Sequence, residues 1–145
     1  MRKKRRELRD EAISRLRAAG LRPTRQRVEL AGLLFAEGHR HLTAESLREE
    51  AKSAGVIVSL ATVYNTLHQF TDAGLLRQVV VDTKRSYFDT NNGEHQHFFL
   101  EDESKLIDIP GETIAVAGVP SPPKGTAIER VDVVVRVRRQ HIAAN

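Results

Sequence analysis

The feature that most constrains the fold is a change in hydrophobic period near residue 75. Before it, apolar residues recur every three or four positions in four segments, the pattern of amphipathic helices packed on one core. Each segment has an N-cap residue before it or a glycine that ends it. The four predicted helices lie within residues 8–20, 24–38, 43–55 and 59–74.

After residue 75, apolar and polar residues alternate, which is typical of strands with one buried face. The first hairpin has a basic tip and the second an acidic turn, and a short helix, a proline-rich loop and a last strand follow. These predicted elements lie at 76–81 with 86–89, 96–100 with 105–109, 112–118, 120–125 and 131–138.

This order predicts an α+β fold with a boundary near residue 90. Three short helices followed by a hairpin are the arrangement of a winged helix-turn-helix, in which the last helix enters the major groove of DNA. We therefore expect an N-terminal winged helix-turn-helix DNA-binding domain at 1–90 and a small α/β dimerisation domain at 91–145. Because so small a second domain rarely buries enough core alone, we expect a homodimer.

The charge distribution favours a polyanionic partner. Residues 1–27 carry 11 basic and 3 acidic side chains, whereas residues 91–145 carry 6 basic and 8 acidic ones. A basic end on such a chain favours nucleic acid, although a solvated tail is the plainer alternative. The apolar runs are too short to cross a bilayer, and the 145 residues include no Cys, which excludes disulfides and thiolate metal sites. We expect a cytoplasmic protein with no membrane partner.

The predicted helix at 59–74 has a small, nearly uncharged outer face, as a base-reading surface should. Thr62 can contact a thymine methyl, and Asn65 can bond adenine through two hydrogen bonds. Ser59 at the helix start and Lys84 and Arg85 at the hairpin tip would bind phosphates. A surface helix of an ordinary small bundle is the alternative, but the basic arm and the hairpin favour double-stranded DNA.

The densest group of histidines is His95 and His97, two residues apart on a predicted strand. Side chains at that spacing point to one face, so both imidazoles can converge on a metal. Such a pair is often without function, but Asp89 and Asp108 lie near it in the predicted hairpins and His41 precedes the third helix. Mixed imidazole and carboxylate ligands suit Fe²⁺, Mn²⁺ or Zn²⁺.

Several segments together resemble the ferric uptake regulator superfamily, helix by helix and in the same order. They are GLRPTRQR, HLTAESL, SLATVYNTLHQFTDAGLL and YFDTNNGEHQHFFLEDESKLIDIP. The resemblance is close over about residues 8–110. The Cys-free chain, the HQHFFLEDESKLIDIP segment and the short proline-rich end are most similar to the iron response regulator branch.

The resemblance implies a mainly repressing, iron-responsive transcription regulator that binds AT-rich operator elements. Arg22 falls where the family has a basic residue that enters the minor groove, and Tyr64 matches a tyrosine that touches bases. Ser59 and Thr62 match positions beside the DNA backbone. Many family members have Arg where this chain has Asn65, so the resemblance implies a different operator.

The resemblance also implies one regulatory metal site between the two domains. Its five positions are held here by His41, Asp89, His95, His97 and Asp108. The family's structural zinc site is missing, because Leu100 and Glu103 stand where it has cysteines. The iron response branch responds to haem, which makes His95 and His97 the candidate haem ligands and a haem-delivering protein a candidate partner.

The sequence is compatible with three functions, which differ in what the chain senses or does. The effector is haem, a divalent metal, or both, and haem would compete with the metal for His95 and His97. A peroxide sensor of the same superfamily is an alternative, because such members also have Asp at the position of Asp89. A metal-dependent hydrolase is disfavoured, since it needs an open coordination position and a general base, whereas five ligands crowd this site and no Gly-rich loop or Ser/His/Asp set accompanies them. We expect that the chain is not an enzyme.

Overall fold

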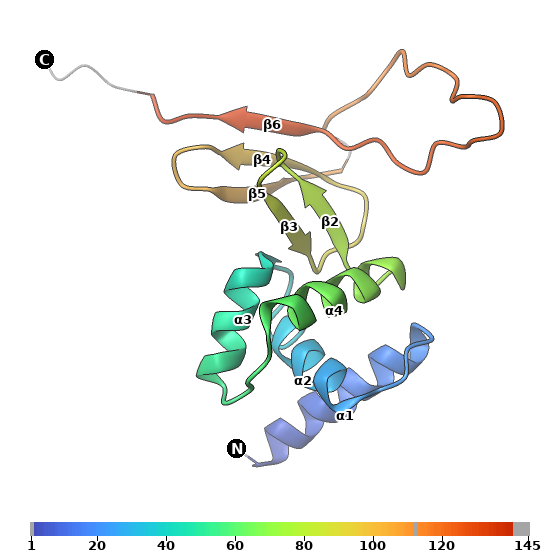
Figure 1. The fold of residues 1–145 in the computed structure, drawn as a ribbon. Coiled ribbons are helices and arrows are strands. Elements are labelled where there is room, and N and C mark those ends of the chain that lie inside the picture. Colours follow the sequence, from blue (N-terminus) through green and yellow to red (C-terminus); the bar gives the residue numbers. More distant parts are fainter. Residues whose placement is uncertain (1, 112, 141–145) are drawn as a thin grey trace, which may run out of the picture. The chain divides into compact units, whose positions relative to one another are not determined.

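The computed structural model describes the backbone of residues 2–111 and 113–140, and the side chains of that part from residue 4 on. The chain divides into two compact units, residues 1–92 and 93–145. Each unit has its own three-stranded sheet (Figure 1). No helix in the described residues is long and apolar enough to span a membrane.

The first unit contains the four helices that the periodicity predicts. They are α1 (Arg2–Ala18), α2 (Arg25–Leu34), α3 (Ala44–Ser53) and α4 (Leu60–Asp72). Thr24, Thr43 and Ser59 cap the last three, each by accepting a hydrogen bond from a backbone N–H in the first turn. Leucines from all four helices meet in one core, where Leu16, Leu30, Leu47 and Leu67 are fully buried.

The end of α4 is set by Gly74. Its φ of 82° is a left-handed conformation that a glycine adopts without steric cost. There the N–H of Leu75 donates to the carbonyl of Phe70 at 2.8 Å and that of Gly74 to the carbonyl of Thr71 at 3.0 Å, which is a Schellman motif. The turn directs the chain from α4 into the first hairpin.

The hairpin of the first unit is part of a three-stranded sheet. It contains β1 (His41–Leu42), β2 (Arg77–Val80) and β3 (Ser86–Asp89), in the order β1-β3-β2 and all antiparallel. The two long strands match the predicted hairpin within a residue or two. The short β1 was not predicted, because two residues are too few to show a period. Phe88 on β3 is fully buried and joins the helical core.

The second unit contains β4 (Gln96–Leu100), β5 (Lys105–Ile109) and β6 (Val134–Val137), in the order β5-β4-β6. The acidic turn between β4 and β5 lies at residues 101–104 as predicted. The last strand starts three residues later than predicted, since the N–H of Val133 donates to the Gln96 side chain at 2.7 Å and not to a strand backbone.

The helix predicted at 112–118 is wrong for the part of it that the structure describes. Residues 113–118 form no helix, and Glu112 lies outside the described residues. A helix this short needs a packed apolar face to be stable in water. Val116 is 47% exposed, so the segment has no such face.

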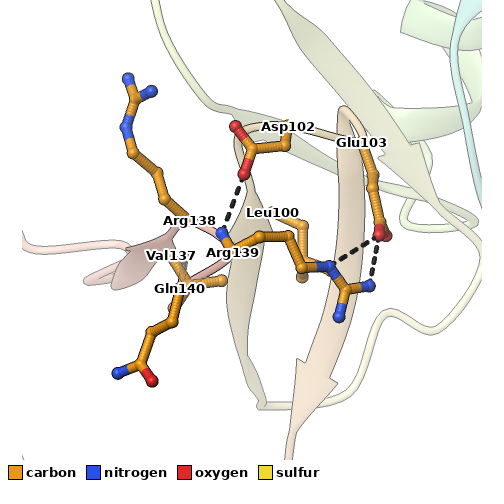
Figure 2. Close-up of a pocket in the computed structure, with 7 residues that line it drawn as sticks. All are labelled: Leu100, Asp102, Glu103, Val137, Arg138, Arg139 and Gln140. Carbon is orange, nitrogen blue, oxygen red and sulfur yellow. Dashed lines mark hydrogen bonds and ion pairs between the residues drawn. The ribbon is translucent and has the colours of Figure 1, made fainter. Parts of the chain in front are cut away.

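An ion-pair network holds β6 against the acidic turn (Figure 2). The Arg139 guanidinium donates to the Glu103 carboxylate, and the Arg139 backbone N–H donates to Asp102 at 2.8 Å. The hydrogen bond that the guanidinium donates to Glu103 raises the pKa of Arg139. Arg136 on β6 pairs with Glu101 at 2.9 Å. Surface pairs of this kind contribute little to stability, so their main effect is to position the end of β6 beside the turn.

Candidate functional site

Three metal-competent side chains gather in the second unit. His97 on β4 lies directly opposite Asp108 on β5, and His95 comes just before β4. The Nε2 atoms of both histidines lie 3.4 Å from Asp108 Oδ1. The two ring centroids are 4.6 Å apart, and the ligand atoms of the three residues lie within 4.8 Å of one another. We call these three residues the HHD cluster.

The orientation of His95 in the HHD cluster is fixed by the backbone. Its Nδ1 lies 2.7 Å from the carbonyl oxygen of Gly93. A carbonyl can only accept, so Nδ1 is the donor in this contact, and Nε2 is the ring nitrogen that would be available to a metal. Metal-binding histidines commonly have such a partner on the second ring nitrogen. The two histidines are almost fully buried, at 5% and 1% exposure.

The first unit holds a second pair of candidate ligands. His41 on β1 and Asp89 on β3 are cross-strand neighbours, with His41 Nε2 3.2 Å from Asp89 Oδ2. Asp89 is fully buried, and its Oδ1 accepts the N–H of Asn91 at 2.9 Å. Buried Arg77 on β2 lies opposite Asp89 on the other side. A carboxylate without solvent needs nearby positive charge and donors of this kind.

The donor chemistry of the HHD cluster fits a divalent transition metal. Two neutral imidazoles and one carboxylate match the ligand preferences of Fe²⁺, Mn²⁺ and Zn²⁺. The structure thus brings together three of the five predicted metal residues in one unit and the other two in the other unit. The sequence indicated that His95, His97 and Asp108 would lie close together, because both strands of their hairpin were predicted.

Three of the seven residues predicted to contact DNA line a hollow on the first unit. Arg22, Thr62 and Asn65 are all part of it. The rest of its lining is Thr24, Gln26, Arg27, Thr66 and Gln69. Sequence reasoning missed Arg27 and Gln69. Their contact joins α2 to α4 across 42 residues, and no local pattern shows such a pair.

Three of the predicted DNA residues at or on α4, Ser59, Thr62 and Tyr64, already have hydrogen-bond partners. Ser59 Oγ accepts the N–H of Thr62 at 3.1 Å and donates to its hydroxyl at 2.9 Å, so Ser59 is first of all a helix cap. The Tyr64 hydroxyl donates to the Glu45 carboxylate at 2.9 Å, and this bond raises the pKa of Tyr64. The tyrosine is half-buried, as expected for the border of the outer face.

The tip of the first hairpin combines an exposed and a paired cation. Lys84 is exposed. The Arg85 guanidinium is bound to Asp82, with Nε to Oδ2 at 2.8 Å. This contact, together with the backbone N–H of Lys84, lowers the pKa of Asp82 to about 2. Arg85 therefore presents a partly neutralised charge, and Lys84 is the stronger candidate for a phosphate.

The remaining histidines show no ligand arrangement in the described residues. His39 is exposed on its own. The ring of His68 lies on α4 between those of Tyr64 and Phe88, with centroids 6.4 and 5.7 Å away. His141 lies outside the described residues.

The chain is similar to known regulators over most of its length. The sequence profile described as "Ferric uptake regulator family" matches residues 18–132. The peroxide-responsive repressor PerR of Staphylococcus aureus is 33% identical over 100 residues, which are 69% of this chain and 67% of that protein.

Solved structures are similar as well. The ferric uptake regulator from Pseudomonas aeruginosa with manganese has a TM-score of 0.66 at 28% identity and covers 90% of this chain and 98% of its own. The Vibrio cholerae ferric uptake regulator has the same TM-score at 21% identity, covering 88% and 98%. The second likeness supports the α+β fold alone.

The pairing of Asp82 with Arg85 predicts a carboxyl that titrates near pH 2 in a carbon-detected NMR titration. Since its pKa lies below that of an unfolded chain, the contact stabilises the fold above about pH 4, and this contribution is lost as the pH falls toward 2. Arg85→Gln should raise the midpoint toward about 4. Lys84→Gln, which keeps the backbone N–H, should not. A wild-type midpoint near 4 would contradict the pairing.

Proposed function

Because the chain belongs to the ferric uptake regulator family, we propose that it is a DNA-binding transcription regulator whose operator affinity depends on a divalent metal. The similar proteins are named as regulators and repressors, so the chain is a regulator and the hydrolase alternative is set aside. The observation that carries the metal dependence is the HHD cluster, two buried imidazoles on one carboxylate.

The metal would be held by His95, His97 and Asp108. The manganese in the Pseudomonas aeruginosa regulator supports a divalent ion of this kind. His41 and Asp89 would complete the ligand set, a proposal that rests on the positions these residues occupy in the family's motif. When bound, the ion would supply a positive charge that its imidazole and carboxylate ligands share. The imidazoles and carboxylates would then be held together by coordination.

DNA would meet the first unit on the outer face of α4. Asn65 is exposed there and offers the amide that bonds adenine, and Arg22 is an exposed cation beside it on the same hollow. Further phosphate contacts would come from Lys84 and from the exposed cations near the start of α1, Lys4, Arg5, Arg6 and Arg9. Positive charge is unfavourable at a helix N-terminus, and a polyanion would offset that cost. AT-rich operators remain the expected target.

A second copy of the chain would bind the open face of the second unit's sheet. Phe98 on β4 and Ile107 on β5 are directly opposite one another and are 38% and 41% exposed. Val135 on β6 faces Phe98 from the other side. A row of apolar side chains across three strands costs free energy in water, and burying it against an identical row is the simplest remedy in a unit this small.

The effector is proposed to be iron, sensed as haem or as the bound metal. His95 and His97 are nearly fully buried, so they reach haem iron only if their segment rearranges. In doing so they would leave Asp108, and haem and the metal would therefore compete. The peroxide-responsive relative favours a second candidate, in which the Fe²⁺ form reacts with peroxide at a ligand histidine.

The proposal predicts that Mn²⁺ raises the affinity for DNA selected from a random-sequence pool by at least about fivefold, the lower end of typical coupling between sites. Fluorescence anisotropy measures it. His97→Ala should lose the Mn²⁺ response and keep the metal-free affinity. His39→Ala, an exposed histidine outside the cluster, should respond as the wild type does. An equal Mn²⁺ response in His97→Ala would contradict the proposal, and one in His41→Ala would remove His41 from the ligand set.

The second-copy proposal predicts that Phe98→Glu with Ile107→Glu converts a dimer to a monomer in sedimentation velocity, because four carboxylates would be buried at the interface. Val119→Glu places a carboxylate on an exposed loop residue and should leave the dimer intact. A wild-type monomer, or a dimer that survives the double change, would contradict it.

Two measurements on one preparation distinguish haem from peroxide as the effector. If haem is the effector, adding it to the Mn²⁺–protein–DNA complex releases DNA, and His95→Ala with His97→Ala abolishes the release. If peroxide is the effector, mass spectrometry of the Fe²⁺ form after peroxide finds one added oxygen on His41 or His95. We expect haem release without oxygen addition, and the reverse result would favour the peroxide sensor.

A further inference from the structure

Arg27 at the start of α2 connects three parts of the first unit. Its Nε and Nη2 both donate to Gln69 Oε1 on α4, at 3.2 and 3.0 Å. Its Nη1 donates to the carbonyl oxygen of Arg22 at 3.0 Å. The half-buried side chain of Arg27 therefore connects α2, to which it belongs, with α4 and with the segment before α2. We call this set of bonds the Arg27 bracket.

The bracket fixes the backbone that carries Arg22. The Arg22 carbonyl accepts both from Arg27 and from the N–H of Thr24, at 3.0 and 2.9 Å. Pro23 between them has its φ held near −65° by its ring. The Arg22 side chain itself stays exposed, on the same hollow as Asn65 of α4.

The acceptor on α4 is neutral, which sets this arginine apart from Arg85. Gln69 satisfies the guanidinium without neutralising it, whereas Arg85 is paired with a carboxylate. The fork of Nε and Nη2 on one oxygen also needs the planar guanidinium, because a lysine ammonium is a compact donor on a flexible stem. A lysine at position 27 would therefore keep the positive charge but lose the forked contact, so experiment can distinguish the two properties.

We propose that Arg27 is a positioning residue of the DNA interface. Its bracket holds the Arg22 segment and α4 at one separation, so that Arg22 and Asn65 meet the same duplex without further ordering. A loose segment would have to be ordered when DNA binds, and that entropy cost would weaken binding. This inference rests on the proposed DNA-binding function and adds the residue that aligns its two contact elements.

The competing role for Arg27 is a direct phosphate contact, and the charge-keeping variants distinguish the two. Arg27→Lys and Gln69→Ala both keep the positive charge, so a direct phosphate contact predicts near wild-type affinity for both, whereas losing such a contact would lower the slope of log affinity against log salt by about 1. A positioning role predicts weaker binding of both variants at every salt concentration with the slope unchanged.

The test measures the affinity of Arg27→Lys, Gln69→Ala and the double variant for selected DNA with Mn²⁺, over a salt series. We expect each single change to weaken binding about tenfold with an unchanged salt slope. The double variant should be no weaker than Arg27→Lys alone, because both changes remove the contact between Arg27 and Gln69. Arg25→Lys is the matched control, since Arg25 is on the same helix, is exposed and pairs only with Glu29 among the described residues. Wild-type affinity in Arg27→Lys or in Gln69→Ala would overturn the proposal.

A second measurement checks the bracket in the free protein. The Nε–H of Arg27 should be protected from solvent exchange in nitrogen-edited NMR, lose protection in Gln69→Ala, and keep it in Gln69→Glu, which retains the acceptor oxygen. An unprotected Nε–H in the wild type would overturn the bracket. If Arg27→Lys fails to fold, Gln69→Ala decides the outcome alone. A wild-type chain that binds no DNA would overturn the proposed function as well, whereas wild-type binding with an unaffected Gln69→Ala overturns only this inference.

Discussion

Cross-strand register is the constraint on which the candidate metal residues depend. In an antiparallel pair, directly opposite residues bring their side chains to one face within a few ångströms. His97 faces Asp108 in this way in one sheet, and His41 faces Asp89 in the other. A slip of one residue would turn each side chain to the opposite face. The turn at 101–104 joins β4 to β5 and so sets the register that places His97 opposite Asp108.

The first unit separates packing from recognition on the two faces of α4. Leu67 and Phe70 are completely buried, so the rotation of the helix about its axis is fixed by the core. The outer face carries Asn65, which is exposed, so packing does not constrain which residue occupies position 65. Polar contacts from neighbouring elements adjust the details: Glu45 orients Tyr64, and Arg27 ties the helix to the Arg22 segment.

Sequence reasoning succeeded where one period ran through a whole element. The buried stripe and the caps predicted all four helices, and alternation predicted β4 and β5 and hence the approach of His97 to Asp108. It failed where tertiary contacts decide. The two-residue β1 exists only by pairing with β3, and the segment at 113–118 has apolar residues but no surface to pack on. The contact between Arg27 and Gln69 joins distant residues, so no local pattern marks it.

Metal binding and DNA binding are proposed to be coupled in one molecule. Coupling between two ligands is reciprocal, so the factor by which Mn²⁺ strengthens DNA binding must equal the factor by which DNA strengthens Mn²⁺ binding. The most direct measurement is the Mn²⁺ affinity of the full chain with and without saturating operator DNA. The account predicts tighter Mn²⁺ binding in the presence of DNA, and a loss of that difference in His97→Ala. Equal Mn²⁺ affinities with and without DNA would contradict it.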